Sequence, residues 1–238
     1  MTILHGPLSD ADVLAVYDEA EACWFFNYDG DPKALLHAIL TAPHSDGDEI
    51  HSNGYTDSQK VYSKTWLARP LVAELIRRLH RRNALSEHVN LVVSSSSSAI
   101  HFGYELARQL GTEARFVEKN PVYEMEKRGP RFICKFSVPE GCRVLRAEEL
   151  ITTFETTGAV RDAIETANPH GRIRWNPDVA CGILRPDTDR VMMAFGDIIY
   201  LAKRIVQNWP AKQCPLCAAG STALKPKGEN WAKLTGRA

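Results

Sequence analysis

The sequence predicts an α/β fold in which helices flank a mainly parallel sheet. Two apolar runs, at residues 89–93 and 143–147, are each followed by a polar loop and then by a helical pattern, at 99–110 and 159–167. Strands that alternate with helices form parallel sheets through right-handed crossovers. Further strands are predicted at 114–117, 132–136 and 179–184.

The N-terminal part is predicted to begin with an amphipathic helix. Ser9 opens a capping-box pattern, and the apolar residues from Val13 to Trp24 recur at helical spacing. The aromatic cluster at residues 24–26 is expected to be core or subunit-interface material rather than a ligand platform. Residues 34–40 are expected to form another short helix.

Residues 44–63 are rich in Ser, Asp, Asn and Gly, so they are expected to add little to the core. They form either a surface loop or a binding loop. The histidines in this stretch indicate a metal only weakly, because no helix-spaced pair or cysteine partner accompanies them in the sequence.

Pro70 is expected to open a helix with an apolar face over residues 71–79. Its other face is cationic, and a solvated surface is favoured over nucleic-acid contact. The residues of that face are Arg77, Arg78, His80, Arg81 and Arg82.

The composition is that of an ordinary globular protein, with 238 residues and a formal net charge of +0. A global field that would attract nucleic acid or an anionic membrane is therefore not expected. No apolar run approaches the length of a membrane span, and the six scattered cysteines suit a reducing compartment. We expect a cytoplasmic protein with neither a nucleic-acid nor a membrane partner.

Residues 143–158 have the order of a nucleotide site. An apolar strand leads to Glu148 and Glu149, and a threonine-rich turn then enters a helix. Acids at a strand end can hold a metal or sugar hydroxyls, while a helix N-terminus offers N–H groups to a phosphate. The alternative is that the acids are solvated and that Thr152 to Thr157 form an ordinary capped turn.

Two more loops carry ligand chemistry. Ser94 to Ser98 lie between a strand and a helix, where hydroxyls and amides can face an anion. Residues 119–131 form a loop with Lys119, Lys127, Arg128 and Arg131, which is either a functional cationic loop or a solvated hairpin.

These three loops, in this order, resemble those of the type I phosphoribosyltransferases, and within them the orotate phosphoribosyltransferases. The likeness extends over about residues 50–227. It includes Ser52-Asn53-Gly54 and the ending Cys214-Pro215-Leu216-Cys217, which is similar to that of one bacterial branch. The resemblance implies a phosphoribosyltransferase core at 65–205, with a small hood formed by the terminal segments 1–64 and 206–238.

The resemblance also implies roles for particular residues. Phosphoribosyl pyrophosphate (PRPP) would bind with Mg²⁺, and Glu148 and Glu149 would hold the ribose hydroxyls, contact Mg²⁺ through the substrate and stabilise an oxocarbenium-like centre. Catalysis would further involve Lys119, Lys127 and Arg128, which neutralise the departing pyrophosphate and reach a neighbouring subunit's site in a homodimer. The 5′-phosphate would bind at residues 152–157, pyrophosphate at Ser94, Ser95, Ser96, Ser97 and Ser98, and the base at Ser52, Asn53, Lys60 and Arg185.

The sequence departs from the family pattern on its ligand loops. Phe154 and Glu155 stand in the phosphate turn where glycine or a small residue is usual, and an inward Glu155 would repel a phosphate by ~4 kcal/mol. Serines replace a glycine-containing pyrophosphate loop, Glu149 replaces aspartate, and Leu184 replaces an acid. Transfer of a phosphoribosyl group to a pyrimidine or related base is favoured. The alternatives are a non-catalytic nucleotide-binding or regulatory module, and an enzyme acting on a modified nucleoside or nucleotide.

Cys214 and Cys217 form a C-x-x-C pair in the C-terminal segment. Structural packing is favoured for this pair. Zinc is less favoured because two more ligands would be needed, and a redox motif is expected near an early strand rather than in a tail.

Overall fold

The computed structural model describes residues 6–26, 36–40, 49–126, 128–186 and 198–236. A six-stranded sheet forms its centre, in the order β10-β9-β8-β5-β6-β7. All neighbours are parallel except β6 and β7, which confirms the mainly parallel sheet. The strands are β5 (Leu91–Ser95), β6 (Glu113–Lys119), β7 (Phe132–Ile133), β8 (Arg143–Ile151), β9 (Arg174–Leu184) and β10 (Ile198–Lys203).

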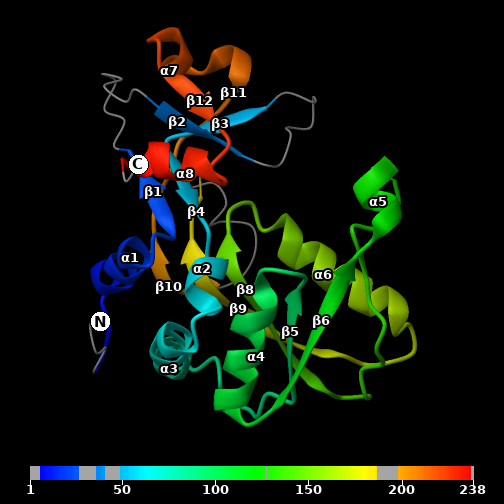
Figure 1. Cartoon of the computed structure of the whole chain (residues 1–238). Coiled ribbons are helices and arrows are strands. Elements are labelled where there is room, and N and C mark those ends of the chain that lie inside the picture. Colours follow the sequence, from blue (N-terminus) through cyan, green and yellow to red (C-terminus); the bar gives the residue numbers. More distant parts are fainter. Residues whose placement is uncertain (1–5, 27–35, 41–48, 127, 187–197, 237–238) are drawn as a thin grey trace.

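Helices cover both faces of this sheet (Figure 1). Alternation along β5 sends Val92 into a core with α1 (Asp10–Glu19), α3 (Thr65–Arg81) and α4 (Ala99–Leu110), and sends Leu91 and Val93 to the opposite face. The second face packs against α6 (Glu155–Ala167). The fold therefore has three layers, with the carboxyl ends of the parallel strands at one edge.

Helix α4 forms where the sequence places it, whereas α1 begins as predicted but ends at Glu19, because Cys23 and Trp24 belong to the strand β1 (Cys23–Phe25). Ser9 and Asp12 make the reciprocal hydrogen bonds of a capping box at α1. Helix α4 spans the predicted residues and ends at Gly111, whose φ of 69° is a left-handed conformation that glycine adopts without strain.

Two helix starts were predicted too late. Helix α3 begins at Thr65, so Pro70 lies inside it, and Ala68 in its early part is buried in the core. That packing stabilises the turns before the proline despite the lost N–H. Helix α6 likewise begins at Glu155 rather than at Ala159.

The arginines of α3 are not simply a solvated face. Glu74 is fully buried and accepts hydrogen bonds from Arg77, Arg78 and Arg81. It also accepts one from the Leu8 amide, 3.2 Å from its Oε2. Arg78 donates in addition to the carbonyls of Leu8 and Tyr200, so this network fastens the segment before α1 to the core.

A second, four-stranded sheet joins the two ends of the chain in the order β11-β3-β2-β12 (Figure 1). With α7 and α8 we call it the hood. The prediction of a helix at 34–40 is wrong, because residues 36–39 pair with strands on both sides and this pairing overrides a weak helical pattern. The elements of the hood are β2 (Leu36–Ile39), β3 (Ile50–Ser52), β11 (Asn208–Pro210), the 3₁₀ turn η2 (Ala211–Gln213), α7 (Pro215–Ala218), β12 (Thr222–Leu224) and α8 (Glu229–Thr235).

The polar stretch at 44–63 contributes more to the interior than expected. From residue 49 on it forms β3, β4 (Gly54–Thr56) and α2 (Gln59–Tyr62), and β4 pairs with β1 (Cys23–Phe25). Several of its polar residues are buried, and most of them hydrogen-bond to neighbouring segments, whereas the Thr56 hydroxyl has no partner among the described residues. The buried ones are His51, Ser52, Asn53, Thr56 and Ser58.

One helix stands away from the body of the molecule. The α5 helix (Pro121–Glu126) lies between β6 and β7 and projects beyond the sheet edge (Figure 1). None of its residues is buried. Across the described ranges, no helix combines the length and apolarity needed to cross a membrane.

Candidate active site

Glu148 and Glu149 lie in the last part of β8, at the edge where the parallel strands end. Glu148 is buried, and it accepts hydrogen bonds from the Ser95 amide (3.2 Å) and the Ser95 hydroxyl (2.8 Å). Burial first, and then the neighbouring Glu149, raise the pKa of Glu148. The carboxyl is thus fixed by β5 and favours any arrangement that brings positive charge to it.

Glu149 is the second acid of the site. Burial and the charge of Asp57 raise the pKa of Glu149, while the Ser98 hydroxyl opposes that shift. Its backbone carbonyl accepts a hydrogen bond from Ser58 at 3.4 Å. The Glu148 carboxyl is therefore held from β5 and the Glu149 carboxyl from the start of α4, while the segment before α2 holds the backbone of Glu149.

A glycine that the sequence analysis did not single out allows this packing. A Cβ on Gly182 would lie 2.5 Å from the Glu149 carbonyl oxygen and 2.7 Å from the Tyr62 hydroxyl. No side chain fits there, because real Cβ atoms do not approach other atoms so closely. The glycine of β9 is thus required for the close approach of β8, and only the three-dimensional packing reveals it.

The threonine-rich turn enters α6 at its N-terminus. Phe154 is the N-cap residue and has a left-handed backbone, with φ at 68°. Its side chain is buried in a cluster with Ile151, Val179, Cys181 and Leu184. The ring consequently belongs to the core beneath the turn rather than to the surface of the turn.

The rest of the turn is compatible with an anion. Glu155 is exposed in the first turn of α6, so solvent screens its charge. Thr153 is exposed, while Thr152 and Thr156 are half-buried. The Thr157 hydroxyl is buried and has no hydrogen-bond partner in the described part of the chain. An orphaned hydroxyl at a helix N-terminus is suited to a phosphate oxygen.

The serine loop is shared between the scaffold and the site. Ser94 and Ser95 belong to β5 and are buried, so they are not open hydroxyls of a loop. Ser96 accepts a hydrogen bond from the Lys119 amide at 3.0 Å, and the peptide between residues 96 and 97 is cis. Ser97 is exposed.

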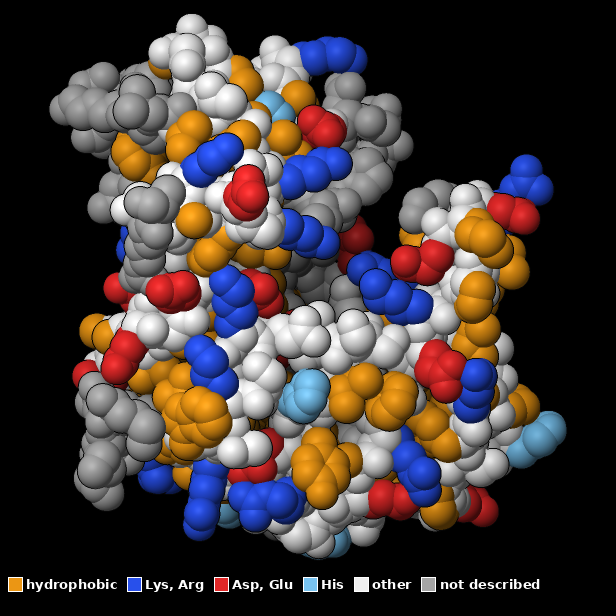
Figure 2. Space-filling view, viewed as in Figure 1, with side chains coloured by type: hydrophobic (Ala, Val, Ile, Leu, Met, Phe, Trp, Pro, Cys, Tyr) orange, Lys and Arg blue, Asp and Glu red, His pale blue; other side chains and the backbone are white. Residues whose placement is uncertain are grey.

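The cationic loop is divided by α5. Lys119 ends β6, and Arg128 is exposed on the far side of the helix. Lys127 lies outside the described residues. Asn120 closes the base of the loop with two hydrogen bonds. Its side-chain amide donates to the Pro130 carbonyl, and its backbone N–H donates to the Arg131 carbonyl. We call α5 and the loop residues on either side of it the arm. Figure 2 shows a notch between the hood and the arm, with Lys and Arg side chains gathered along it.

Two of the residues expected at the base, Ser52 and Arg185, meet around Gly54. Arg185 is buried, and its Nη1 donates to the Gly54 carbonyl at 3.2 Å, while Ser52 Oγ accepts from the Gly54 amide at 3.1 Å. Burial lowers the pKa of Arg185 to about 10, so it remains a cation at neutral pH. Its Nε has no hydrogen-bond partner among the described residues.

Asn53 and Lys60 have structural partners instead. Asn53 donates to the Phe26 carbonyl at 2.9 Å and accepts from the Gln207 amide at 2.8 Å. Lys60 donates to the Glu21 carbonyl and lies 4.4 Å from the centre of the Trp231 ring. Asn53 does line a cavity of about 560 Å³ with Phe25, Phe26 and residues 203–207, which the sequence analysis missed.

The structure brings the C-x-x-C pair against two histidines of the hood, His37 and His51. The two further ligands that the spacing did not reveal are therefore present in space. The sequence offered little sign of a metal site, because His37 lies in a segment predicted to be a helix and His51 in one predicted to be a loop.

The fold is that of the type I phosphoribosyltransferases. Among solved structures, the chain is similar to the orotate phosphoribosyltransferase from Aeropyrum pernix, with a TM-score of 0.53 and 12% identity over 80% of this chain and 93% of that one. The orotate phosphoribosyltransferase of Mycobacterium tuberculosis H37Rv gives a TM-score of 0.50 at 16% identity, over 81% and 96%. No protein-family model matches the chain.

The particular family follows from sequence relatives. The orotate phosphoribosyltransferase of Heliobacterium modesticaldum is 30% identical over 180 residues, which cover 74% of this chain and 84% of the relative. That of Caldicellulosiruptor bescii is 28% identical over 198 residues, covering 82% and 92%. The chain belongs to the orotate phosphoribosyltransferase family, as the loops in the sequence indicated.

Proposed function

We propose that the protein transfers a phosphoribosyl group between pyrophosphate and orotate. The observation that carries this function is the acid pair of buried Glu148 and half-buried Glu149, set between the serine loop and the N-terminus of α6. Two acids beside an anion site suit a substrate with a sugar next to phosphates. They would accept the ribose hydroxyls and stabilise positive charge as it develops on the sugar.

The same acids fit Mg²⁺. Their carboxylates are hard oxygen ligands, and a cation beside them would offset the burial and the neighbouring negative charge that raise their pKa values. Glu148 and Glu149 would hold the ion together with the substrate. When bound, Mg²⁺ neutralises charge on the pyrophosphate group.

The divergent phosphate turn does not argue for a lost site. The Phe154 side chain packs downward into the core, and Glu155 is exposed to solvent. The 5′-phosphate would meet the amides and hydroxyls of residues 152–157, including the unpaired hydroxyl of Thr157. Phe154 and Glu155 motivated the alternatives of a non-catalytic module and a modified nucleotide substrate. Their side chains are thus compatible with the 5′-phosphate at this turn.

Arg185 supports a base that carries a carboxylate. Its guanidinium is buried at the hood side of the site, and its Nε–H has no hydrogen-bond partner among the described residues. A planar fork with an unused donor suits two-point binding of a carboxylate, which orotate provides. An uncharged pyrimidine would leave the buried cation unpaired at a cost of several kcal/mol.

We further propose a homodimer in which the arm with α5 reaches the partner's site. Lys119 and Arg128 flank this arm, and Lys127 belongs to it by sequence. Phe116, Val122 and Met125 are large exposed apolar side chains on or beside it, with 76% of Met125 exposed. Apolar surface next to cations is typical of a contact that also delivers charge to a ligand.

The direct test is turnover by the whole chain with Mg²⁺, PRPP and orotate, measured as loss of orotate absorbance and release of pyrophosphate. We expect orotate-dependent pyrophosphate release. A folded protein that binds PRPP without turning over orotate or any of a panel of bases would contradict the proposal and favour the binding module.

The base assignment is tested with Arg185→Lys, which keeps the charge and removes the fork. We expect kcat/KM for orotate to fall about 10- to 100-fold, with little change in KM for PRPP. Arg174→Lys is the matched control, because Arg174 lies at the opposite end of the same strand in a surface ion pair with Glu87. Equal kinetics for the Arg185 variant and the wild type would exclude the assignment.

A further inference from the structure

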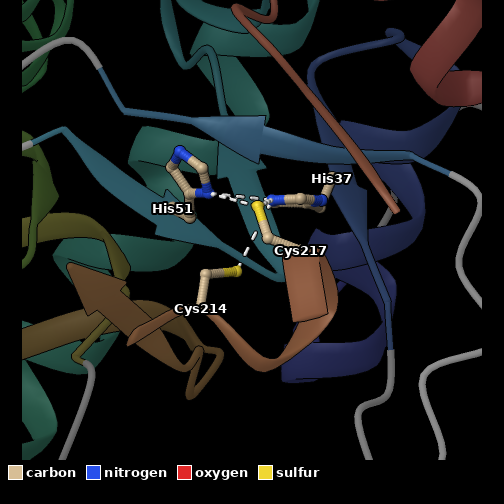
Figure 3. Close-up of side chains that lie close together, drawn as sticks. All are labelled: His37, His51, Cys214 and Cys217. Atoms are coloured by element: carbon tan, nitrogen blue, oxygen red, sulfur yellow. Dashed lines mark hydrogen bonds between the residues drawn. The ribbon is translucent and has the colours of Figure 1, made fainter. Parts of the chain in front are cut away.

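Four side chains in the hood converge on one point (Figure 3). His37 comes from β2 and His51 from the neighbouring strand β3, while Cys214 precedes α7 and Cys217 lies within it. One ligand atom from each lies within 4.8 Å of all the others. His37, His51 and Cys214 are buried, and Cys217 closes the cluster on its solvent side.

Hydrogen bonds do not account for this arrangement. The Nε2 atom of His37 lies 3.0 Å from His51 Nδ1, 3.5 Å from Cys217 Sγ and 3.6 Å from Cys214 Sγ. A ring nitrogen has either one hydrogen or one lone pair, so it can serve only one of these three neighbours well. The remaining contacts are at most weak S–H bonds, and two nitrogens and two sulfurs this close together form a donor set that suits a cation.

The separations match a tetrahedral zinc site. With Zn–N bonds of about 2.0 Å and Zn–S bonds of about 2.3 Å, ligands at tetrahedral angles lie about 3.3 Å apart for N and N, and about 3.5 Å for N and S. The observed N–N distance is 3.0 Å, and the N–S distances run from 3.3 to 3.6 Å. Small adjustments of the side chains would admit the ion.

The surroundings support a ligating role for His37. Its second ring nitrogen, Nδ1, lies 2.9 Å from the hydroxyl of Ser221, which is also buried. Such a partner fixes the ring orientation and the tautomer, as is usual for a histidine that binds a metal.

We propose that His37, His51, Cys214 and Cys217 bind a structural Zn²⁺ ion. Protein ligands fill all four positions, which is the pattern of structural rather than catalytic zinc. The ion would fasten the C-terminal segment to the β2–β3 pair at the point where the two ends of the chain meet. Since β3 continues into Ser52 and Gly54, the same bond would hold the segment that supports Arg185.

The first test measures metal in the unmodified full chain. Protein purified without added metal is analysed by mass spectrometry for zinc, and we expect about one Zn²⁺ per chain. The metal is then removed with a chelator and replaced by Co²⁺. A tetrahedral site with two thiolates should give strong visible d–d bands and a sulfur-to-cobalt charge-transfer band in the near ultraviolet. Zinc-free protein that rejects Zn²⁺ and Co²⁺ would overturn the proposal.

The second test uses variants. Cys217→Ser should lose the bound zinc and the cobalt spectrum, and chelation of the wild-type protein should lower its melting temperature by about 5 °C or more. Cys134→Ser, which removes a cysteine outside the cluster, should keep both metal and melting temperature. Retention of stoichiometric zinc by Cys217→Ser and also by His51→Ala would refute the assignment. So would a Cys214–Cys217 disulfide found by mass spectrometry in protein prepared without an oxidant.

Discussion

At the scale of single residues, the direction in which a side chain points decides whether an unusual residue blocks a site or stabilises the core. Phe154 occupies a turn where a glycine suits the backbone, and it has the left-handed φ of 68° that such a position demands. Strain of about 1–2 kcal/mol is the cost of that conformation. The buried ring offsets this cost through its contacts with Ile151 and Leu184.

We therefore expect Phe154→Gly to destabilise the protein rather than to repair its phosphate site. Loss of the ring should cost about 3–5 kcal/mol, and relief of the strain should return about 1–2 kcal/mol, which leaves a net loss of about 1–4 kcal/mol. The measurement is urea unfolding, with kcat/KM for PRPP measured alongside. Glu155→Gly, at the next and exposed position, serves as the control and should change stability far less. A more stable Phe154→Gly protein would show that the ring contributes nothing.

At the scale of elements, α3 shows how a charged helix face can be part of the interior. Its arginines lie at positions typical of a solvated surface, yet three of them donate to Glu74, whose side chain is fully buried. Burial alone raises the pKa of Glu74, but the hydrogen bonds from Arg78 and Arg77 outweigh it, so the pKa is lowered. Helix α3 and the segment before α1 thus depend on an ionised carboxyl.

We expect Glu74→Gln to lower the free energy of unfolding at pH 7 by about 2–3 kcal/mol, at the lower end for a buried pair because its arginines are partly exposed. Because the folded-state pKa lies below the unfolded one, this stabilisation is complete above the unfolded pKa of about 4.3 and is lost as the pH falls through the folded value. Urea unfolding at several pH values between neutral and acidic measures the difference between wild type and variant.

The control is Glu118→Gln, whose partner Lys135 lies across an exposed ion pair. That variant should cost no more than about 1 kcal/mol. If the difference between wild type and Glu74→Gln were the same at pH 3 as at pH 7, the ionised carboxyl would not be its source.

At the scale of the whole molecule, the arm with α5 lies apart from the body of the chain. It projects from the sheet, none of its residues is buried, and Met125 is largely exposed (Figure 1). The acids at the end of β8 and the cations beside the arm lie on different parts of one chain. A dimer with shared sites would bring the arm of one subunit to the acids of the other.

Shared sites can be tested by mixing two inactive variants. Glu148→Gln should disable the acid pair, and Lys119→Ala should disable the arm. After subunit exchange, half of the dimers contain one of each chain and have one intact site, so up to about a quarter of wild-type activity should return. Activity that stays at the sum of the separate variants, in dimers shown to have exchanged, would place each arm at its own subunit's site. A protein that sediments as a monomer at assay concentration would exclude the dimer.

Local patterns in the sequence determined the parallel sheet, the capping of α1, the whole of α4 and the order of the three ligand loops. The cap and the helix arise from contacts between near neighbours, which leave positional and periodic signals, and the parallel sheet follows from the alternation of local strand and helix patterns. The same signals indicated the orotate phosphoribosyltransferase family and the acid pair at the end of β8.

Only the tertiary structure decided the features that join distant parts of the chain. The strand at 36–39 exists because β3 and β12 pair with it, and Gly182 is needed because β8 approaches it closely. The inward turn of Phe154 and the arginines around Glu74 depend on which surfaces become buried. The four candidate zinc ligands lie up to 180 positions apart in sequence, and only the pairing of the chain ends brings them within reach of one ion.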